Sequence, residues 1–128
     1  MESLKIRTGE VRLQILGDDG EERGIFSFNP EDVASARRFL EIRKELAIKH
    51  EEFEAQEKAC ETDESRADLL NDIVNYFETL IDECWGAGTS KMLFGDAKTL
   101  GMFADFFDGI SPYYADASKK RVKEYTKK

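Results

Sequence analysis

The spacing of apolar residues changes abruptly at Phe28, and this change constrains the fold more than any other feature. Before Phe28, apolar side chains recur at every second position, which is the period of a half-buried strand. After Pro30 the alternation stops, and no Gly or Pro interrupts the chain as far as Cys60. The sequence therefore predicts an α+β fold that is predominantly helical, with a small sheet at its start.

The alternating region predicts a short antiparallel β-meander over residues 1–28. Thr8-Gly9-Glu10 is suited to close one hairpin, and Asp18-Asp19-Gly20 provides the Asp-Gly pair favoured in a second turn. Three strands are few for independent stability, so one face of the sheet is expected to lie on a helix. The alternating residues are Leu4 and Ile6, then Val11, Leu13 and Ile15, then Phe26 and Phe28.

Strong helix-start signals follow the meander. Asn29 is suited to cap a helix and Pro30 to occupy its first position, while Phe28 is spaced to pack on Val33. The helix is expected to run to about Cys60, with apolar residues that recur every seven positions along a narrow seam. These residues are Phe39, Leu46, Phe53 and Cys60.

A second helix is expected after a short link. The short link predicts that the two helices form an antiparallel helical hairpin over residues 29–85. Thr62, Asp63 or Ser65 is suited to cap it, and Ser65 and Asp68 have capping-box spacing. Its apolar stripe is wide enough for the central core helix, and consists of Leu70, Ile73, Val74, Phe77, Leu80, Ile81 and Cys84.

The next stretch, GAGTSKMLFGD at residues 86–96, has the composition of a phosphate-binding loop. Such a loop needs a strand before it and a Gly-Lys-Ser/Thr order, whereas here a helix precedes and Lys91 follows Ser90. The dinucleotide pattern fails as well, because Lys91 or Met92 stands where the third glycine belongs. We therefore interpret the stretch as a connector, not as a nucleotide site.

The connector is expected to consist of helix ends and caps. Gly86 and Gly88 end one helix, Thr89 or Ser90 caps a single turn through Leu93 and Phe94, and Gly95-Asp96 ends that turn and caps the next helix.

Two further helices are expected after the connector. The first carries Leu100, Phe103, Phe107 and Ile110, with Gly109 suited to its end. The last begins at Ser111-Pro112 and continues through Tyr125. At 128 residues the chain fits a single domain, 1–128, with the connector and both C-terminal helices in 86–128.

Residues able to carry chemistry are sparse and scattered. His50 is the single histidine, and a helix would place Glu54 and Glu57 on its side, but a solvated polar face is the favoured interpretation. Asp105 and Asp108 flank two phenylalanines and give only a weak hint of a raised pKa. We predict no catalytic residues, no metal ligands and no cofactor, and hence no enzyme.

Charge is distributed unevenly along the chain. The net charge is −8, yet residues 118–128 hold six Lys/Arg and one Glu. The acidic remainder repels phosphates, so no nucleic acid partner is expected. The basic end is interpreted as a solvated helix end that complements the helix dipole, or as a surface for an anionic partner. No apolar run reaches the length of a membrane span and no secretion signal is apparent, which favours the cytoplasm, no membrane partner and reduced thiols at Cys60 and Cys84.

Aromatic residues are concentrated in one part of the chain. Nine of the fourteen lie between Tyr76 and Tyr114, and they form either core or an exposed groove for the helix of a partner. The candidate partner-binding residues are Trp85, Phe94, Phe103, Phe106, Phe107, Tyr113 and Tyr114, with basic Lys119, Lys120 and Arg121.

The last third of the chain resembles small proteins encoded among the tail genes of long-tailed bacteriophages and prophages of Gram-positive bacteria. Those proteins carry a Phe-Gly-x-Gly-Thr-Ser-x-x-x-Phe-Gly signature followed by a helix with paired aromatics and a basic end, and are described as tail assembly chaperones. Trp85 replaces the usual first phenylalanine. The matching residues are Asp82, Gly86, Gly88, Thr89, Ser90, Phe94, Gly95, Phe103, Phe106 and Phe107.

The resemblance implies a non-enzymatic assembly factor in the bacterial host cytoplasm. Such a factor binds the tape measure protein, helps to recruit tail tube protein and is absent from the mature virion. A homo-oligomer is compatible with the exposed seam of the first helix. The alternative is a minor structural or head-tail connector protein of the virion, and an enzyme acting on a small ligand is the more distant alternative.

Overall fold

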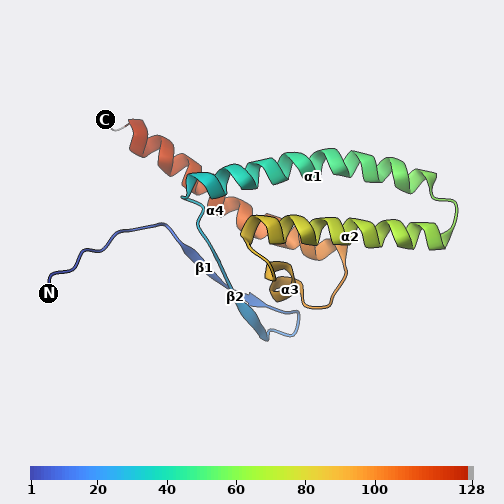
Figure 1. Ribbon diagram of the computed structural model, residues 1–128, viewed down its shortest axis with the longest axis horizontal. Helices are drawn as coiled ribbons and strands as arrows, with labels where there is room; N and C mark the ends of the chain where they lie inside the picture. Colours follow the sequence, from blue (N-terminus) through green and yellow to red (C-terminus); the bar gives the residue numbers. More distant parts are fainter. Residues whose placement is uncertain (127–128) are drawn as a thin grey trace.

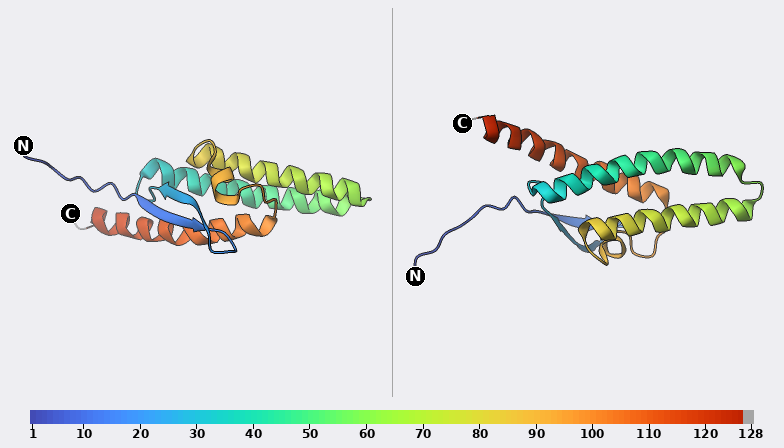
Figure 2. Two further views of the ribbon diagram at one scale, coloured as in Figure 1. Left: turned by 90° about the horizontal axis from the view of Figure 1, so that it is seen from below. Right: turned by 45° about the horizontal axis from the view of Figure 1, so that its top comes forward.

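The structure is a computed structural model that describes residues 1–126, so Lys127 and Lys128 of the basic end lie outside the described residues. It confirms a predominantly helical α+β fold. The helices α1 and α2 lie side by side as an antiparallel hairpin, α4 forms a second layer against it, and the sheet and α3 lie at one end (Figures 1 and 2). The elements are β1 (Val11–Leu16), β2 (Glu22–Phe28), α1 (Val33–Ala59), α2 (Asp63–Trp85), α3 (Thr89–Phe94) and α4 (Leu100–Thr126).

The sheet has two antiparallel strands, with Leu13 paired to Phe26, and the turn predicted at Asp18-Asp19-Gly20 joins them. The strand expected at Leu4 and Ile6 is absent: residues 1–10 have no regular structure, and these two side chains are 83% and 76% exposed. The side-chain amide of Asn29 donates to the backbone carbonyl of Thr8 at 2.7 Å. This bond holds the chain beside the start of α1, and Arg7 forms an ion pair with Glu124 of α4 at 3.2 Å; the chain before Arg7 extends away from the body (Figure 1).

The first helix begins three residues later than the sequence predicts. Asp32 is its N-cap, and its carboxylate accepts from the Ser35 amide at 3.0 Å. The Asn29 side chain instead caps the preceding turn, and Pro30 lies buried outside the helix. Val33 is 72% exposed, so the expected packing of Phe28 on Val33 is wrong.

The hairpin itself forms as predicted. Of the three candidate caps, Thr62 begins α2, and it forms a reciprocal capping box with Ser65 in place of the expected Ser65 and Asp68 pair. The helix ends at Trp85, where Gly86 adopts a φ of +114° that few other residues tolerate.

A single helix, α4, replaces the two expected at the C-terminus. Gly109 and Pro112 lie inside it. Ile110 before Pro112 and Tyr114 after it are both buried, so both halves of the helix are held against the core. The ring of Pro112 faces solvent, and the Ser111 hydroxyl donates to the carbonyl of Phe107 at 2.6 Å. Tertiary packing therefore outweighs the tendency of proline to end a helix.

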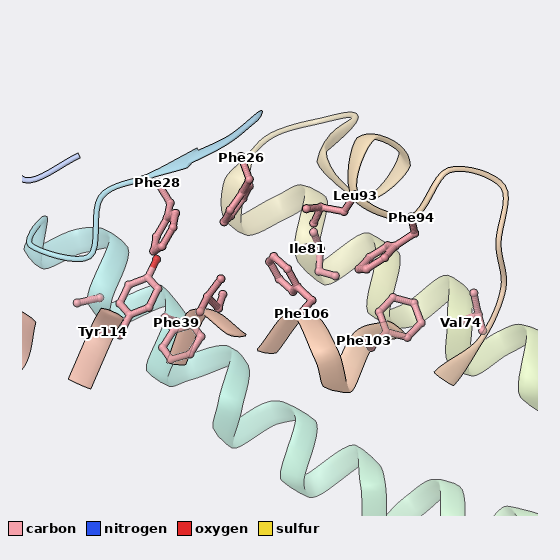
Figure 3. Close-up of a cluster of buried hydrophobic side chains, with 12 residues drawn as sticks. Phe26, Phe28, Phe39, Val74, Ile81, Leu93, Phe94, Phe103, Phe106 and Tyr114 are labelled. Carbon is pink, nitrogen blue, oxygen red and sulfur yellow. The ribbon is translucent and has the colours of Figure 1, made fainter. Parts of the chain in front are cut away.

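The core lies where the sheet, α3 and α4 meet the first half of α1 and the second half of α2 (Figure 3). Phe39 and Ile81 are its most deeply buried large side chains. Phe39 stacks on Tyr114 with ring centroids 4.1 Å apart, and Phe26 meets Phe106 edge to face at 5.4 Å. The far part of the hairpin has no such layer and extends past it (Figure 2).

Candidate functional site

The glycine-rich connector is held by a carboxylate from the preceding helix. Asp82 of α2 accepts a hydrogen bond from the backbone amide of Ser90 at 2.8 Å, which satisfies one free amide in the first turn of α3. Gly88 is the N-cap and has a φ of +87°, but no side chain caps from that position. The prediction that Thr89 or Ser90 caps α3 is therefore wrong. Asp96 does not cap α4 either, since that helix begins at Leu100.

Most of the candidate partner-binding aromatics are core residues. Phe94, Phe103, Phe106 and Tyr114 are 2–9% exposed. The structure thus places these four in the core, not in an open aromatic groove. Trp85 and Phe107 are partly buried against the same core, and Tyr113 is 37% exposed.

Polar contacts fix the Tyr114 ring in place. Its hydroxyl lies 3.0 Å from the Ser35 hydroxyl and accepts from the indole N–H of Trp85 at 3.3 Å. Burial raises the pKa of Tyr114, and hydrogen bonds from these partners act in the opposite direction.

The three basic candidates have different surroundings. Arg121 donates to the carbonyl of Pro30 at 2.9 Å, and Lys120 forms an ion pair with Glu31 at 3.2 Å. These contacts attach α4 to the segment before α1, so both residues have structural roles. Lys119 is exposed.

A groove of about 490 Å³ with a mixed polar and apolar lining lies between the turn end of the sheet, α3 and the start of α4. Its apolar lining includes Ile15, Leu16 and Met102, and the core residues Phe94 and Phe106 also line it. We call this the sheet–α4 groove. It combines two of the aromatics predicted to bind a partner with three apolar residues that were not predicted to do so.

The exposed position of Leu16 has a local cause. The alternation of β1 places Leu16 on the same exposed face as Arg12 and Gln14, and the register shift between Ile15 and Leu16 leaves the extra residue, Arg23, on β2. Leu16 is 55% exposed beside the groove. Two adjacent apolar residues at the end of an alternating strand were the available sequence signal.

Charged groups at the groove are few and of both signs. Arg23 lies at the strand end, where its guanidinium donates to the carbonyl of Leu93 at 3.3 Å, and Asp18 and Asp105 also line the groove. A groove that combines apolar and polar lining in this way is suited to a segment of another protein that offers both kinds of side chain.

A narrower groove of about 200 Å³ separates α1 from α4. The stacked rings of Phe39 and Tyr114 line it together with Leu40, which is 53% exposed. The Arg43 guanidinium lies 5.9 Å from the centre of the Phe39 ring and covers part of this lining.

Of the groups considered for chemistry, Asp105 lines the sheet–α4 groove, whereas Asp108, His50 and the two cysteines line neither groove. His50 pairs with Glu54 at 3.0 Å on the exposed surface of α1, and residues 1–126 contain no group of three His, Cys, Asp or Glu placed to hold a metal ion. Cys60 and Cys84 are both free thiols. Burial raises the pKa of Cys84 to about 11, which makes its reactive thiolate scarce near neutral pH.

In the described part of the chain, no helix has the length and apolar character needed to cross a membrane. Residues 22–128 match the model of a family described as "Family of unknown function (DUF6673)". No curated protein and no solved structure matches the chain.

Proposed function

We propose that this chain, which belongs to the DUF6673 family of unknown function, is a non-enzymatic tail assembly chaperone of a bacteriophage or prophage. Its partner is an apolar segment of the tape measure protein, and tail tube protein is the second partner that it helps to recruit. It acts in the bacterial cytoplasm and is absent from the mature virion. The resemblance of residues 86–128 to such proteins is the basis of this assignment.

The sheet–α4 groove is the structural observation that supports a binding function. Leu16 and Met102 lie at an opening that is lined by core aromatics, so an apolar side chain of the partner is removed from water without any change in the core. The remaining aromatic side chains are largely buried in the core and do not offer a comparable surface.

Co-expression with the neighbouring tape measure gene tests the function. The expected result is that the wild-type chain raises the soluble amount of tape measure protein several-fold over its expression alone. No increase would exclude the chaperone function. Mass spectrometry of purified particles distinguishes the alternative, because a virion protein is recovered with the particles and a chaperone is not.

A matched pair of variants tests the groove separately. Leu16→Glu places a charge in the groove, whereas Leu40→Glu makes the same change at a residue of equal exposure on α1: the two side chains are 55% and 53% exposed. We expect Leu16→Glu to abolish the gain in tape measure solubility and Leu40→Glu to preserve it. A loss with Leu40→Glu alone would move the binding surface to the α1–α4 groove and leave the function intact.

A further inference from the structure

Two helix ends extend beyond the core, and each continues an apolar stripe that the core buries. On α2, Ile81 and Phe77 pack in the core, and Leu70 lies eleven and seven residues before them on the same face of the helix. Leu70 is 42% exposed, because α4 begins only at Leu100, which is itself 43% exposed. This face of the far hairpin lacks the layer that α4 provides nearer the core.

The C-terminal end of α4 shows the same pattern. Tyr125 lies eleven residues, or three turns, after buried Tyr114 and therefore on the same face. Tyr125 is 80% exposed, and its neighbour Val122 is 60% exposed. The helix extends past α1 at this end of the molecule (Figures 1 and 2).

The two ends carry opposite charge. Residues 51–72, which form the far hairpin, hold nine acidic and two basic residues, whereas 118–126 hold four basic residues and one Glu. Figure 1 shows the hairpin tip and the end of α4 at opposite ends of the long axis. Charges arranged in this way repel like ends of two copies and attract unlike ends.

We propose that the C-terminal end of α4 in one copy docks on the acidic far hairpin of a second copy, with Tyr125 beside Leu70. Lys119 and Lys123 project from the side of α4 away from Tyr125, so their charge attracts hairpin carboxylates such as Glu57 and Glu61 across solvent and not through direct ion pairs. This contact joins two different surfaces, so it generates open chains or rings. It uses neither the sheet–α4 groove nor the tape measure protein, and is independent of the proposed function.

Light scattering on the purified full-length chain measures this association. We expect the mass to rise with concentration at about 50 mM salt and to return to that of one chain at about 500 mM, where screening is strong. A constant mass of one chain at low salt would overturn the proposal.

Charge reversal identifies the surfaces. Lys119→Glu/Lys123→Glu changes the charge of residues 118–126 from +3 to −1 and is expected to remove association, whereas Glu57→Lys/Glu61→Lys reduces the negative charge of residues 51–72 from −7 to −3 and is expected to weaken it. The matched control Arg12→Glu/Lys91→Glu changes net charge by the same amount as the first variant, at exposed residues away from both ends, and should still associate. Association lost equally in this control would attribute the effect to net charge and contradict the docking model.

The apolar part of the contact is tested separately from the charges. Tyr125→Ser should weaken association of the wild-type charges at least ten-fold through the loss of its apolar contact. Unchanged association of Tyr125→Ser, with the variant folded by circular dichroism, would overturn the contact between Tyr125 and Leu70.

Discussion

At the scale of single residues, the connector depends on one carboxylate that lies outside it. Asp82 accepts from the Ser90 amide in a partly buried position, so Asp82→Ala leaves that amide without its partner. We expect the free energy of unfolding to fall by about 1–2 kcal/mol, as for loss of an N-cap. Urea denaturation measures this loss. Asp82→Asn, which keeps an acceptor oxygen, should lose less, and Asp96→Ala should change little; equal losses for Asp82→Ala and Asp96→Ala would contradict the capping role.

A second residue-scale prediction concerns pH. Burial raises the pKa of Cys84 from 9.0 to about 11 in the folded chain, so its contribution to stability is complete below pH 9 and is lost as pH rises through 11. As pH rises from 8 to 11, the unfolding free energy of wild type should therefore fall relative to that of Cys84→Ala. Denaturation at a series of pH values measures it. Cys60→Ala leaves Cys84 in place and should retain the wild-type slope; a slope lost in this variant instead would contradict the assignment.

At the scale of elements, local patterns predicted types better than boundaries. The hairpin strands, the turn at Gly20 and the amphipathic helices follow from periodicity, which each segment carries in its own sequence. The position of the α1 cap did not follow, because Asn29 and Asp32 are both good caps and only the burial of Pro30 outside the helix decides between them. Residues 1–10, which include Leu4, form no strand, so alternation alone does not predict that a segment pairs with a neighbouring strand.

The continuity of α4 gives a prediction for this scale. Inside a helix, Pro112 deprives the Asp108 carbonyl of its donor, whereas at the first position of a helix it would be favourable. We expect Pro112→Ala to raise the free energy of unfolding by about 1–2 kcal/mol, because restoring the bond outweighs the greater freedom of the unfolded chain. Urea denaturation again measures the change.

Asp116→Ala, one turn later on the same exposed side, controls for the helix propensity of alanine. A gain no larger than that of Asp116→Ala, or a loss of stability, would instead indicate that a separate helix begins at Pro112.

At the scale of the whole molecule, the candidate site was only partly visible in the sequence. The aromatic cluster was recognised, but composition could not decide between core and groove, because both bury aromatic rings. The decision comes from the crossing of α4 over the hairpin, which encloses Phe103 and Phe106 and leaves Leu16 and Met102 at an opening. This crossing involves residues far apart in the sequence and leaves no local signal.

The same crossing divides the hairpin into a well-packed half and a thin half, which gives the last prediction. Phe39 is 1% exposed and touches Tyr114, Trp85 and the rest of the core, so Phe39→Ala should cost about 3–5 kcal/mol. Phe53 is partly exposed and meets Tyr76 at a centroid distance of 6.0 Å in the two-helix region, so Phe53→Ala should cost under about 2 kcal/mol.

Native-state hydrogen exchange should show the same division, with amides around Phe53 opening at a lower free energy than those around Phe39, because local contact density sets the cost of partial opening. The measurement is made on dilute protein at high salt, where the proposed association is screened. Equal costs for the two substitutions and uniform exchange along α1 would mean that the far hairpin unfolds only with the core. Unequal costs would identify the far hairpin as the less stable part of the molecule. A helix that docks there, from a second copy or from another partner, would then raise its local stability.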